Sequence, residues 1–298
     1  MTVSQAISIY ILKKQEYGRD YRKIAQVLHS FGRLFGSLEL SDLEARHVKL
    51  FLDRRRNLPA TRYHKYMRLR GLFRYWVARG ELKRLPLPRK RAAQPTEFYP
   101  HIFSKHQLRR LLHKVPVTVR APWCVIRPQT MKNLLLFLYG TGLNVGEALR
   151  VRQEDIEMGS STIKILGISG RADRIVPIGK DIKHLVTRQI KISRDSPMLF
   201  CTKSRKPLSH RTASITFRRL CTIAGVCRQK DAVYQPRLCD LRHTFAVHRI
   251  VFWYRSHVSI QKKLPLLAAY MGMVTVTAME KYLLLTPAKY VKQVKQIG

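Results

Sequence analysis

Apolar residues recur at helical spacing through residues 5–80, a pattern that predicts several amphipathic helices. The stretch 21–36 has a period close to ~3.6 residues. Its apolar positions are Ile24, Val27, Leu28, Phe31 and Leu34. The stretch 61–80 carries a similar stripe, whose members are Tyr66, Leu69, Phe73, Trp76 and Val77. We expect both stripes to face the core of one helical domain.

Polar residues ahead of two apolar stretches predict where helices begin. In "LSDLEARHVKLFL", Ser41 is the predicted N-cap, and Glu44 is its expected capping-box partner. In "FSKHQLRRLLHKV", Ser104 is the predicted cap of a later helix. Such side-chain oxygens accept hydrogen bonds from the backbone N–H groups that the first turn of a helix leaves unpaired.

The second half of the chain mixes buried helices with a short hairpin. "QTMKNLLLFLYGTGLNVGEALRV" predicts a buried helix, a glycine-rich break and a second helix. "STIKILGISGRADRIVPIG" has strand character on both sides of Gly167–Gly170, which predicts a β-hairpin. Further helices are expected over 180–190, 209–225, 240–256 and 264–285.

A change of composition near residue 85 predicts a domain boundary. "LPLPRKRAAQPTEFYP", residues 85–100, is rich in proline and basic residues, as extended linkers are. It would separate a helical domain, 1–84, from a larger domain, 101–298.

Charge narrows the choice of partner. Lys and Arg number 57 against 18 Asp and Glu, a formal charge of +39 spread along the whole chain. Self-repulsion at this charge opposes compaction, so we expect a polyanion, with nucleic acid favoured over an anionic membrane surface. No apolar run approaches the ~20 residues of a membrane span. The N-terminus lacks a signal-peptide pattern, so we expect a cytoplasmic, nucleoid-associated protein.

Cysteine and histidine usage gives no sign of a metal site. The five cysteines are an odd number without C-x-x-C spacing, so we expect reduced thiols rather than disulfides or a zinc site. His243 and His248 lack the clustering of metal ligands, and we expect them to pack in the core or to lie at the surface.

Basic residues cover much of the remaining face of the helix predicted over 61–80. They are Arg62, Lys65, Arg68, Arg70 and Arg74. A solvated helix face is the plain alternative, but acidic partners at i+4 spacing are absent from this stretch. Positive charge beside aromatic side chains favours contact with the phosphates of DNA.

Four segments occur in a fixed order: "LYGTGLNVGEALRV", the hairpin ending in "RIVPI", "LCDLRHTFA", and "LPLLAAYMGMVTVTAMEKYLLLTP". Together they resemble the tyrosine recombinase (phage integrase) family over nearly the whole chain. The stretch containing "WYRSHVSIQKKLPLLAAY" is similar to the subgroup encoded by transposons that carry several such recombinases. The resemblance implies a mainly α fold with a small β-sheet. A helical core-binding domain and a tyrosine-recombinase-type catalytic domain would form a C-shaped clamp on double-stranded DNA.

The resemblance also implies a chemistry. In this family a tyrosine hydroxyl attacks a DNA phosphodiester, giving a 3′-phosphotyrosyl link and a free 5′ hydroxyl, and a second strand reverses the step. No metal and no nucleotide cofactor is needed. Two arginines, a hairpin lysine and two histidine-type positions serve the phosphate. The family assembles on DNA, so we expect a homo- or hetero-oligomer, with the C-terminal "TPAKYVKQVKQIG" docking on a neighbour.

Two of the six family positions are retained in this sequence. Arg242 stands in "CDLR", where the family has H-x-x-R, and Tyr282 in "EKYLLLTP" is the candidate nucleophile. The other four positions depart from the pattern: Asn144 replaces the first arginine, Ser169 the hairpin lysine, and Cys239 and Met273 the two histidines. The linker and hairpin supply further expected DNA contacts, namely Arg89, Lys90, Arg91, Arg171 and Arg174.

Three functions remain open at this point. The first is a DNA-binding recombinase-family protein with impaired cleavage, and the second is an active strand transferase that uses substitutes such as Arg150 or Arg171. The third is a basic protein that coats nucleic acid without site specificity. Structural roles are also open: Tyr282 could be a core residue, and Arg242 could pair with Asp240 or with a helix end.

Overall fold

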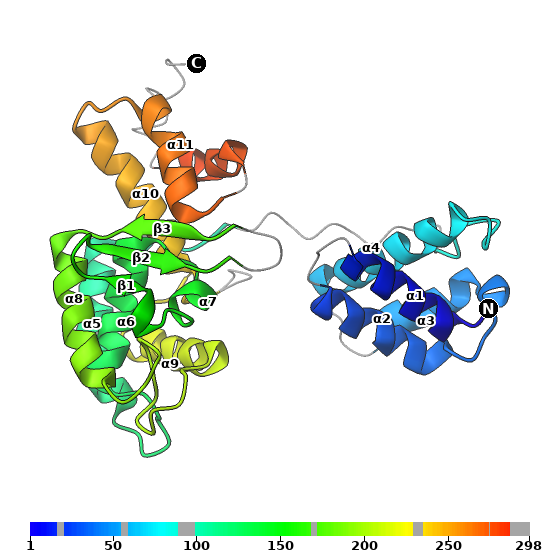
Figure 1. Ribbon diagram of the computed structural model, residues 1–298, viewed down its shortest axis with the longest axis horizontal. Coiled ribbons are helices and arrows are strands. Elements are labelled where there is room, and N and C mark those ends of the chain that lie inside the picture. The colour runs from blue at the N-terminus through cyan, green and yellow to red at the C-terminus, as the bar shows by residue number, and fades with distance from the viewer. Residues whose placement is uncertain are drawn as a thin grey trace. The chain divides into compact units, whose positions relative to one another are not determined.

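A computed structural model (Figure 1) describes seven stretches of the chain, without the side chains of residues 276 and 278. The stretches are 1–16, 21–54, 59–88, 99–167, 172–228, 235–273 and 275–286. Most of a first compact unit lies within Met1–Phe98, and a second unit begins at Tyr99. Much of the predicted linker, the hairpin turn and the C-terminal tail lie outside the described residues.

Four α-helices build the described part of the first unit, as the apolar periodicity predicts. They are α1 (Val3–Glu16), α2 (Arg22–Phe35), α3 (Ala45–Asp53) and α4 (Pro59–Val77). A 3₁₀ turn, Leu40–Asp42, precedes α3. The ring of Phe31 lies inside this core and makes edge-on contacts with Phe51 and Phe73.

The two predicted apolar stripes face this core. On α2, Leu28 and Phe31 are fully buried, and the other three members pack against the core while partly exposed. On α4, the stripe is buried except for Val77, which is partly exposed. Its buried members are Tyr66, Leu69, Phe73 and Trp76.

The start of α3 differs from the prediction. Ser41 is not the N-cap, because residues 40–42 form the 3₁₀ turn and the helix begins at Ala45. Glu44 is the N-cap of α3 instead: the His47 ring accepts from the Glu44 N–H at 3.1 Å, and the His47 N–H donates to the Glu44 carbonyl oxygen. The 3₁₀ turn buries Leu40 and Leu43 before the helix begins.

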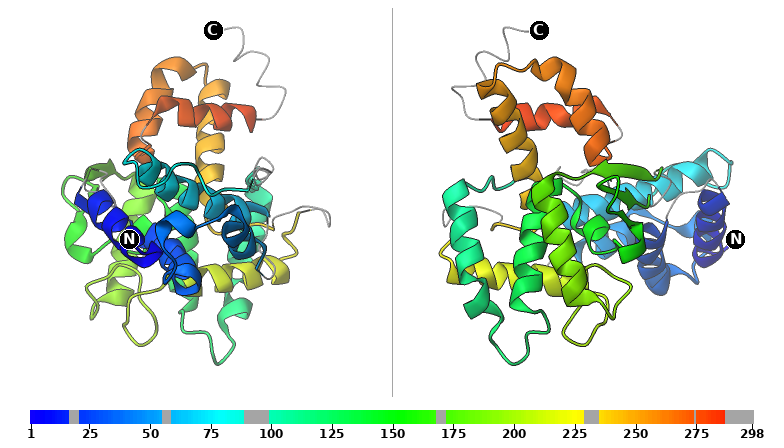
Figure 2. Two further views of the ribbon diagram at one scale, coloured as in Figure 1. Left: turned by 90° about the vertical axis from the view of Figure 1, so that its right-hand side faces the viewer. Right: turned by 60° about the vertical axis from the view of Figure 1, so that its left-hand side comes forward.

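The second unit combines helices with a three-stranded antiparallel sheet (Figure 2). Its strands, in the order β1-β2-β3, are β1 (Ile156–Glu157), β2 (Thr162–Ile165) and β3 (Arg174–Pro177). In the β2–β3 hairpin, Ile163 pairs with Val176 and Ile165 with Arg174. The hairpin agrees with the prediction. Strand β1 was not predicted, because its two residues are too few to show an alternating pattern.

Helix α6 is the most buried helical element around the candidate site and contacts α5, α8 and α10. The helices of the second unit are α5 (Lys105–Val119), α6 (Pro128–Thr141), α7 (Val145–Ala148), α8 (Lys180–Ser193), α9 (His210–Ile223), α10 (Asp240–Arg255), α11 (Ile260–Met271) and α12 (Glu280–Leu284). Ser104 caps α5 as predicted, since its hydroxyl accepts from the Gln107 N–H at 3.1 Å.

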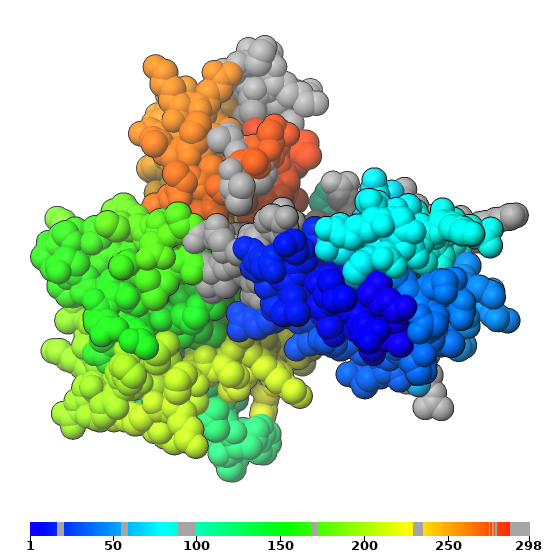
Figure 3. Space-filling model, turned by 45° about the vertical axis from the view of Figure 1, so that its right-hand side comes forward, coloured from blue at the N-terminus to red at the C-terminus, as the bar shows by residue number. Residues whose placement is uncertain are grey.

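The helical stretch predicted over 264–285 is divided in the structure. Helix α11 ends at Met271, where Gly272 takes a left-handed conformation (φ 67°), and a 3₁₀ turn, Val276–Met279, leads into α12. Helices α10, α11 and α12 share their own hydrophobic cluster. They form a raised part of the second unit, orange to red in the space-filling view (Figure 3). This break brings α12 back onto α10.

Apolar side chains gather in three interior clusters. One fills the first unit, a second lies between the sheet and α5 to α9, and the third joins α10 to α12. Across the described ranges, no helix is both long and apolar enough to cross a membrane. The predicted fold class, mainly helical with a small sheet, is confirmed.

Candidate active site

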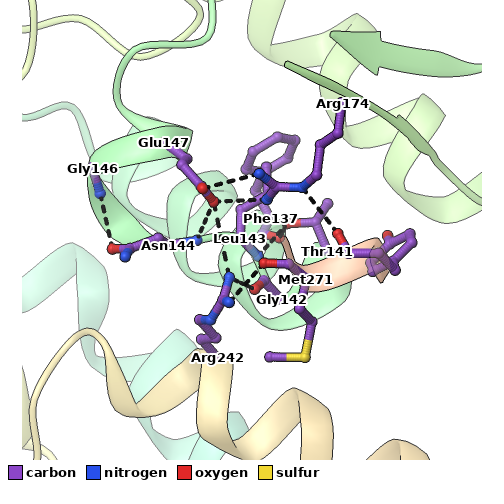
Figure 4. Close-up of polar contacts among 11 residues, drawn as sticks. Phe137, Thr141, Gly142, Leu143, Asn144, Gly146, Glu147, Arg174, Arg242 and Met271 are labelled. Atoms are coloured by element: carbon purple, nitrogen blue, oxygen red, sulfur yellow. Dashed lines mark hydrogen bonds and ion pairs between the residues drawn. The ribbon is translucent and has the colours of Figure 1, made fainter. Parts of the chain in front are cut away.

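Arg242 joins three segments that are distant in the sequence (Figure 4). It lies in the first turn of α10, and its guanidinium donates to the carbonyl oxygens of Gly142 (2.9 Å) and Met271 (2.7 Å). These carbonyls belong to the C-terminal ends of α6 and α11, so the negative ends of two helices meet at one cation. Asp240 pairs with Arg237 instead. Arg242 thus has a structural role at helix ends, and its side chain stays 14% exposed.

Glu147 is held between two arginines. Its carboxylate accepts two hydrogen bonds from Arg174, at 3.0 and 2.9 Å, and lies 3.9 Å from Nη1 of Arg242. The Nε of Arg174 donates to the carbonyl of Tyr270 at 3.2 Å. The guanidinium fills the space beside Gly272, where a Cβ atom would collide with it. Sequence analysis did not single out Glu147, although it is the last letter of "TGLNVGE".

Electrostatics keep Glu147 ionised. Burial raises its pKa, but hydrogen bonds from Arg174 and from the Asn144 N–H, with the charges of Arg174 and Arg242, outweigh burial and lower the pKa overall. The carboxylate therefore neutralises one of the two guanidiniums at neutral pH.

We expect Glu147→Gln to lower the free energy of unfolding by ~3 kcal/mol at pH 7, because it leaves a partly buried guanidinium unpaired. The pKa of Glu147 is lower in the folded state, so its stabilisation is complete above the unfolded pKa of ~4.3 and is lost as pH falls through the folded value. The difference in free energy of unfolding between wild type and variant should narrow below about pH 4, as measured by urea unfolding curves.

The matched control is Glu154→Gln, which breaks the exposed pair with Arg152 and should leave the free energy of unfolding nearly unchanged. A Glu147→Gln variant as stable as wild type at pH 7 would contradict this role.

Asn144 serves as a helix cap. It precedes α7, its Oδ1 accepts from the Gly146 N–H at 3.4 Å, and its own N–H donates to Glu147 at 3.0 Å. The side chain therefore faces the first turn of α7 and brings no charge to the cluster around Glu147 (Figure 4).

Tyr282 lies on α12, which packs against α10, the helix that carries Arg242. Its side chain is completely buried. Its ring packs on that of His243, with centroids 5.5 Å apart, and the ammonium of Lys281 lies 5.1 Å from its ring centroid. Burial raises the pKa of the Tyr282 hydroxyl, while electrostatic interaction with Arg242 opposes the rise. The structure thus brings together Arg242 and Tyr282, the two positions that the resemblance predicts to be retained, 40 residues apart in sequence.

Cys239 and Met273, two positions at which the resemblance predicts histidines, supply no strong donor. Cys239 lies just before α10, partly buried, with its sulfur 3.8 Å from a carboxylate oxygen of Asp240, and burial raises the pKa of its thiol. Met273 is partly buried and packs against the cluster of α10 to α12. Ser169 lies outside the described residues.

His243 lies at the candidate site, with its ring against Tyr282. The sequence predicted only that it packs in the core or lies at the surface. Burial, the largest effect, lowers its pKa to about 4, so its ring is neutral at neutral pH. Its Nδ1 atom is buried and has no hydrogen-bond partner within the described part of the chain. His248 differs, because its Nδ1 lies 2.9 Å from the hydroxyl of Tyr139.

The basic residues of α4 differ in how free they are to meet a polyanion. Arg62 pairs with Asp53 at 2.9 Å, a partner from α3 that a search at i+4 spacing misses. Lys65 stacks 4.8 Å from the ring centroid of Phe51. Arg68 and Arg74 are exposed, whereas Arg70 is half-buried.

Most of the other residues predicted to contact DNA are not among the described residues. Arg89, Lys90, Arg91 and Arg171 lie outside the described residues. The three donor nitrogens of Arg174 each make a contact inside the second unit, which favours a structural role. Arg150, a suggested substitute, lies beside Gly146, and burial lowers the pKa of its guanidinium although Glu147 opposes this.

Known proteins that resemble this chain in sequence or in fold are integrases and recombinases. The profile of the Phage integrase family matches residues 102–251. A provisionally named integrase/recombinase, y4rB, of Sinorhizobium fredii is 28% identical over 298 residues, covering 96% of this chain and 94% of the relative. The integrase of transposon Tn1549 in complex with a circular intermediate DNA has a similar fold, with a TM-score of 0.70 at 15% identity over 95% of this chain and 94% of that one. A lambda integrase dimer bound to a COC′ core site gives a TM-score of 0.67 at 16% identity over 93% of this chain and 97% of that one.

The chain therefore has the fold of the DNA-bound lambda and Tn1549 integrases. The chain belongs to the phage integrase family of tyrosine recombinases.

Proposed function

We propose that this protein binds a specific duplex DNA site and takes part in site-specific DNA recombination or integration, with cleavage by its own tyrosine slowed. The observation that carries the proposal is the pairing of Arg242 with Tyr282 beside an asparagine cap and a neutralised Arg174. The protein would act where its target DNA lies, at the nucleoid.

The grip on DNA is assigned to both domains. A helical domain, 1–84, and a catalytic-type domain, 101–298, would bind the duplex on either side of the basic linker, 85–100. The charge of +39 supports this grip, as do the DNA complexes of the lambda and Tn1549 integrases. The contacts proposed in the first domain and linker are Arg62, Lys65, Arg68, Arg70, Arg74, Arg89, Lys90 and Arg91.

The chemistry assigned to the site is a transfer of the phosphodiester to Tyr282. The Tyr282 oxygen forms a bond to phosphorus as the bond to the 5′ oxygen breaks. The hydroxyl proton passes to water, and the departing 5′ oxygen takes a proton from water. Arg242 would hold a non-bridging oxygen through N–H groups left over from its bonds to the Gly142 and Met271 carbonyls, since a guanidinium has five N–H donors. The protein needs no metal and no nucleotide for this step.

Slow cleavage follows from the charges that the site lacks. Asn144 carries no charge and is engaged as a cap, and the carboxylate of Glu147 offsets Arg174. Burial also raises the pKa of Tyr282, which keeps its hydroxyl protonated. The loss of one preorganised donor typically costs about 10²–10³ in rate, although several such losses do not simply multiply.

A protein of this kind would work in an assembly. The lambda integrase relative is a dimer on its core site. We propose that this chain joins a homo- or hetero-oligomer on DNA, in which intact tyrosine recombinases supply strand cleavage.

Binding selectivity tests the proposed function. A duplex selected by this protein from a random-sequence library should bind about 10³-fold or more tightly than a scrambled duplex of equal length, because base contacts and DNA shape add to the phosphate grip. Affinities would be measured by fluorescence anisotropy at one fixed salt concentration. A ratio near one would instead identify a protein that coats nucleic acid without site specificity.

A further inference from the structure

We propose that Lys281 supplies the second positive charge at the reacting phosphate, in place of the guanidinium that position 144 lacks. The inference rests on the proposed function, in which Tyr282 attacks a DNA phosphodiester, and it assigns to that reaction a residue outside the family pattern.

Most cations around Tyr282 are already matched by a carboxylate. Arg174 forms a double hydrogen bond with Glu147, and Arg237 pairs with Asp240 at 3.3 Å. Arg242 shares Glu147 and also binds two helix ends. Lys281 differs: within the described ranges its ammonium forms no ion pair. It is therefore a charge still available to an anion.

The position of Lys281 suits a phosphate brought to Tyr282. Its Nζ lies 5.1 Å from the centre of the Tyr282 ring, a distance at which a cation interacts with an aromatic face. Because the two residues are neighbours on α12, any movement of that helix that presents the tyrosine hydroxyl also carries the ammonium.

The electrostatic surroundings also favour an anion here. Burial lowers the pKa of Lys281, and the charge of Arg242 lowers it further. Asp240 raises the pKa of His243, whereas Lys281, Arg242 and Arg237 lower it. The Lys281 ammonium therefore adds positive charge beside Arg242 and His243, and a phosphate would offset that charge. Lys281 keeps its protons in this role, and acts as a point charge on a non-bridging oxygen.

A set of duplexes, each with one phosphate replaced by a neutral group, tests the proposal without requiring cleavage. Duplexes of the selected sequence would each carry one methylphosphonate, which removes one negative charge, and affinity would be measured at every position. For wild type we expect a loss of about tenfold at the phosphate that Arg242 and Lys281 share. Lys281→Gln and Arg242→Gln should each remove most of that loss at the same phosphate, and Lys281→Arg should retain it. Lys262→Gln, an exposed change on α11, is the matched control and should leave the profile unchanged.

The possible results separate this proposal from the proposed function. If Lys281→Gln keeps the wild-type profile, or changes it at a different phosphate from Arg242→Gln, Lys281 has no part in the site. A wild-type profile without sensitivity at any position would overturn the specific grip on DNA and the role of Lys281 with it. Thermal unfolding of each variant distinguishes loss of a phosphate contact from loss of fold, because Arg242→Gln also removes bonds to the Gly142 and Met271 carbonyls.

Discussion

Replacing Asn144 with Arg, Ser169 with Lys, and both Cys239 and Met273 with His should raise covalent adduct formation by about 10²–10³ or more. The reason is that, among the described residues, the unmodified site offers Arg242 as the proposed guanidinium for the phosphate, and Arg242 shares Glu147 with Arg174. The measurement uses the selected duplex with nicks that trap the 3′-phosphotyrosyl intermediate. The adduct is resolved on a denaturing gel, and its rate is compared with that of the unmodified protein.

The control for this experiment is Tyr282→Phe. Added to the restored variant, it removes the attacking oxygen and should abolish the adduct while leaving DNA binding intact. An unmodified protein that forms the adduct as fast as an intact recombinase would contradict the proposal of slowed cleavage. Arg150, Arg171 and Lys281 would then be the first substitutes to mutate.

Duplex binding should weaken by about 10⁴-fold between 50 and 200 mM monovalent salt. If about eight phosphates are neutralised, the log–log slope is near −7, because each contact displaces condensed counterions. Substituting Lys65 or Arg68 with Gln should reduce the slope by about one unit and lower affinity for all sequences alike. Arg62→Gln should have a smaller effect, since Asp53 already holds its guanidinium.

Fluorescence anisotropy at five or more salt concentrations would give these slopes. Arg46→Gln on α3 provides a control, because Arg46 is already paired with Glu44. A wild-type slope shallower than about −2 would remove the electrostatic grip on DNA from the proposal.

Local patterns predicted the helical framework well because they act within a few residues. The stripes of α2 and α4 and the Ser104 cap follow from periodicity and from one side chain near one backbone N–H. Prediction was wrong where packing chose between two local options. Ser41 is the better N-cap by residue type, but Leu40 and Leu43 are buried and the helix begins only after Glu44. The split at Gly272 depends likewise on how α12 returns to α10.

The candidate site was only partly accessible from the sequence. Its motifs pointed to Arg242 and Tyr282, which the structure holds together, but whether they act on DNA stays a prediction. The ion pair of Arg174 with Glu147 joins a strand to a helix 27 residues away, so no local pattern reveals it. The same holds for the ring contact between His243 and Tyr282, and for Lys281, whose ammonium forms no ion pair within the described residues.

The Asn144 cap has a consequence for how this site can evolve. Asparagine is among the best residues at a helix N-cap, whereas arginine has no side-chain acceptor for the Gly146 N–H. Replacing Asn144 alone with arginine would therefore lose about 1 kcal/mol of stability. Under the proposal of slowed cleavage, selection for a stable fold would oppose this substitution and favour keeping the asparagine.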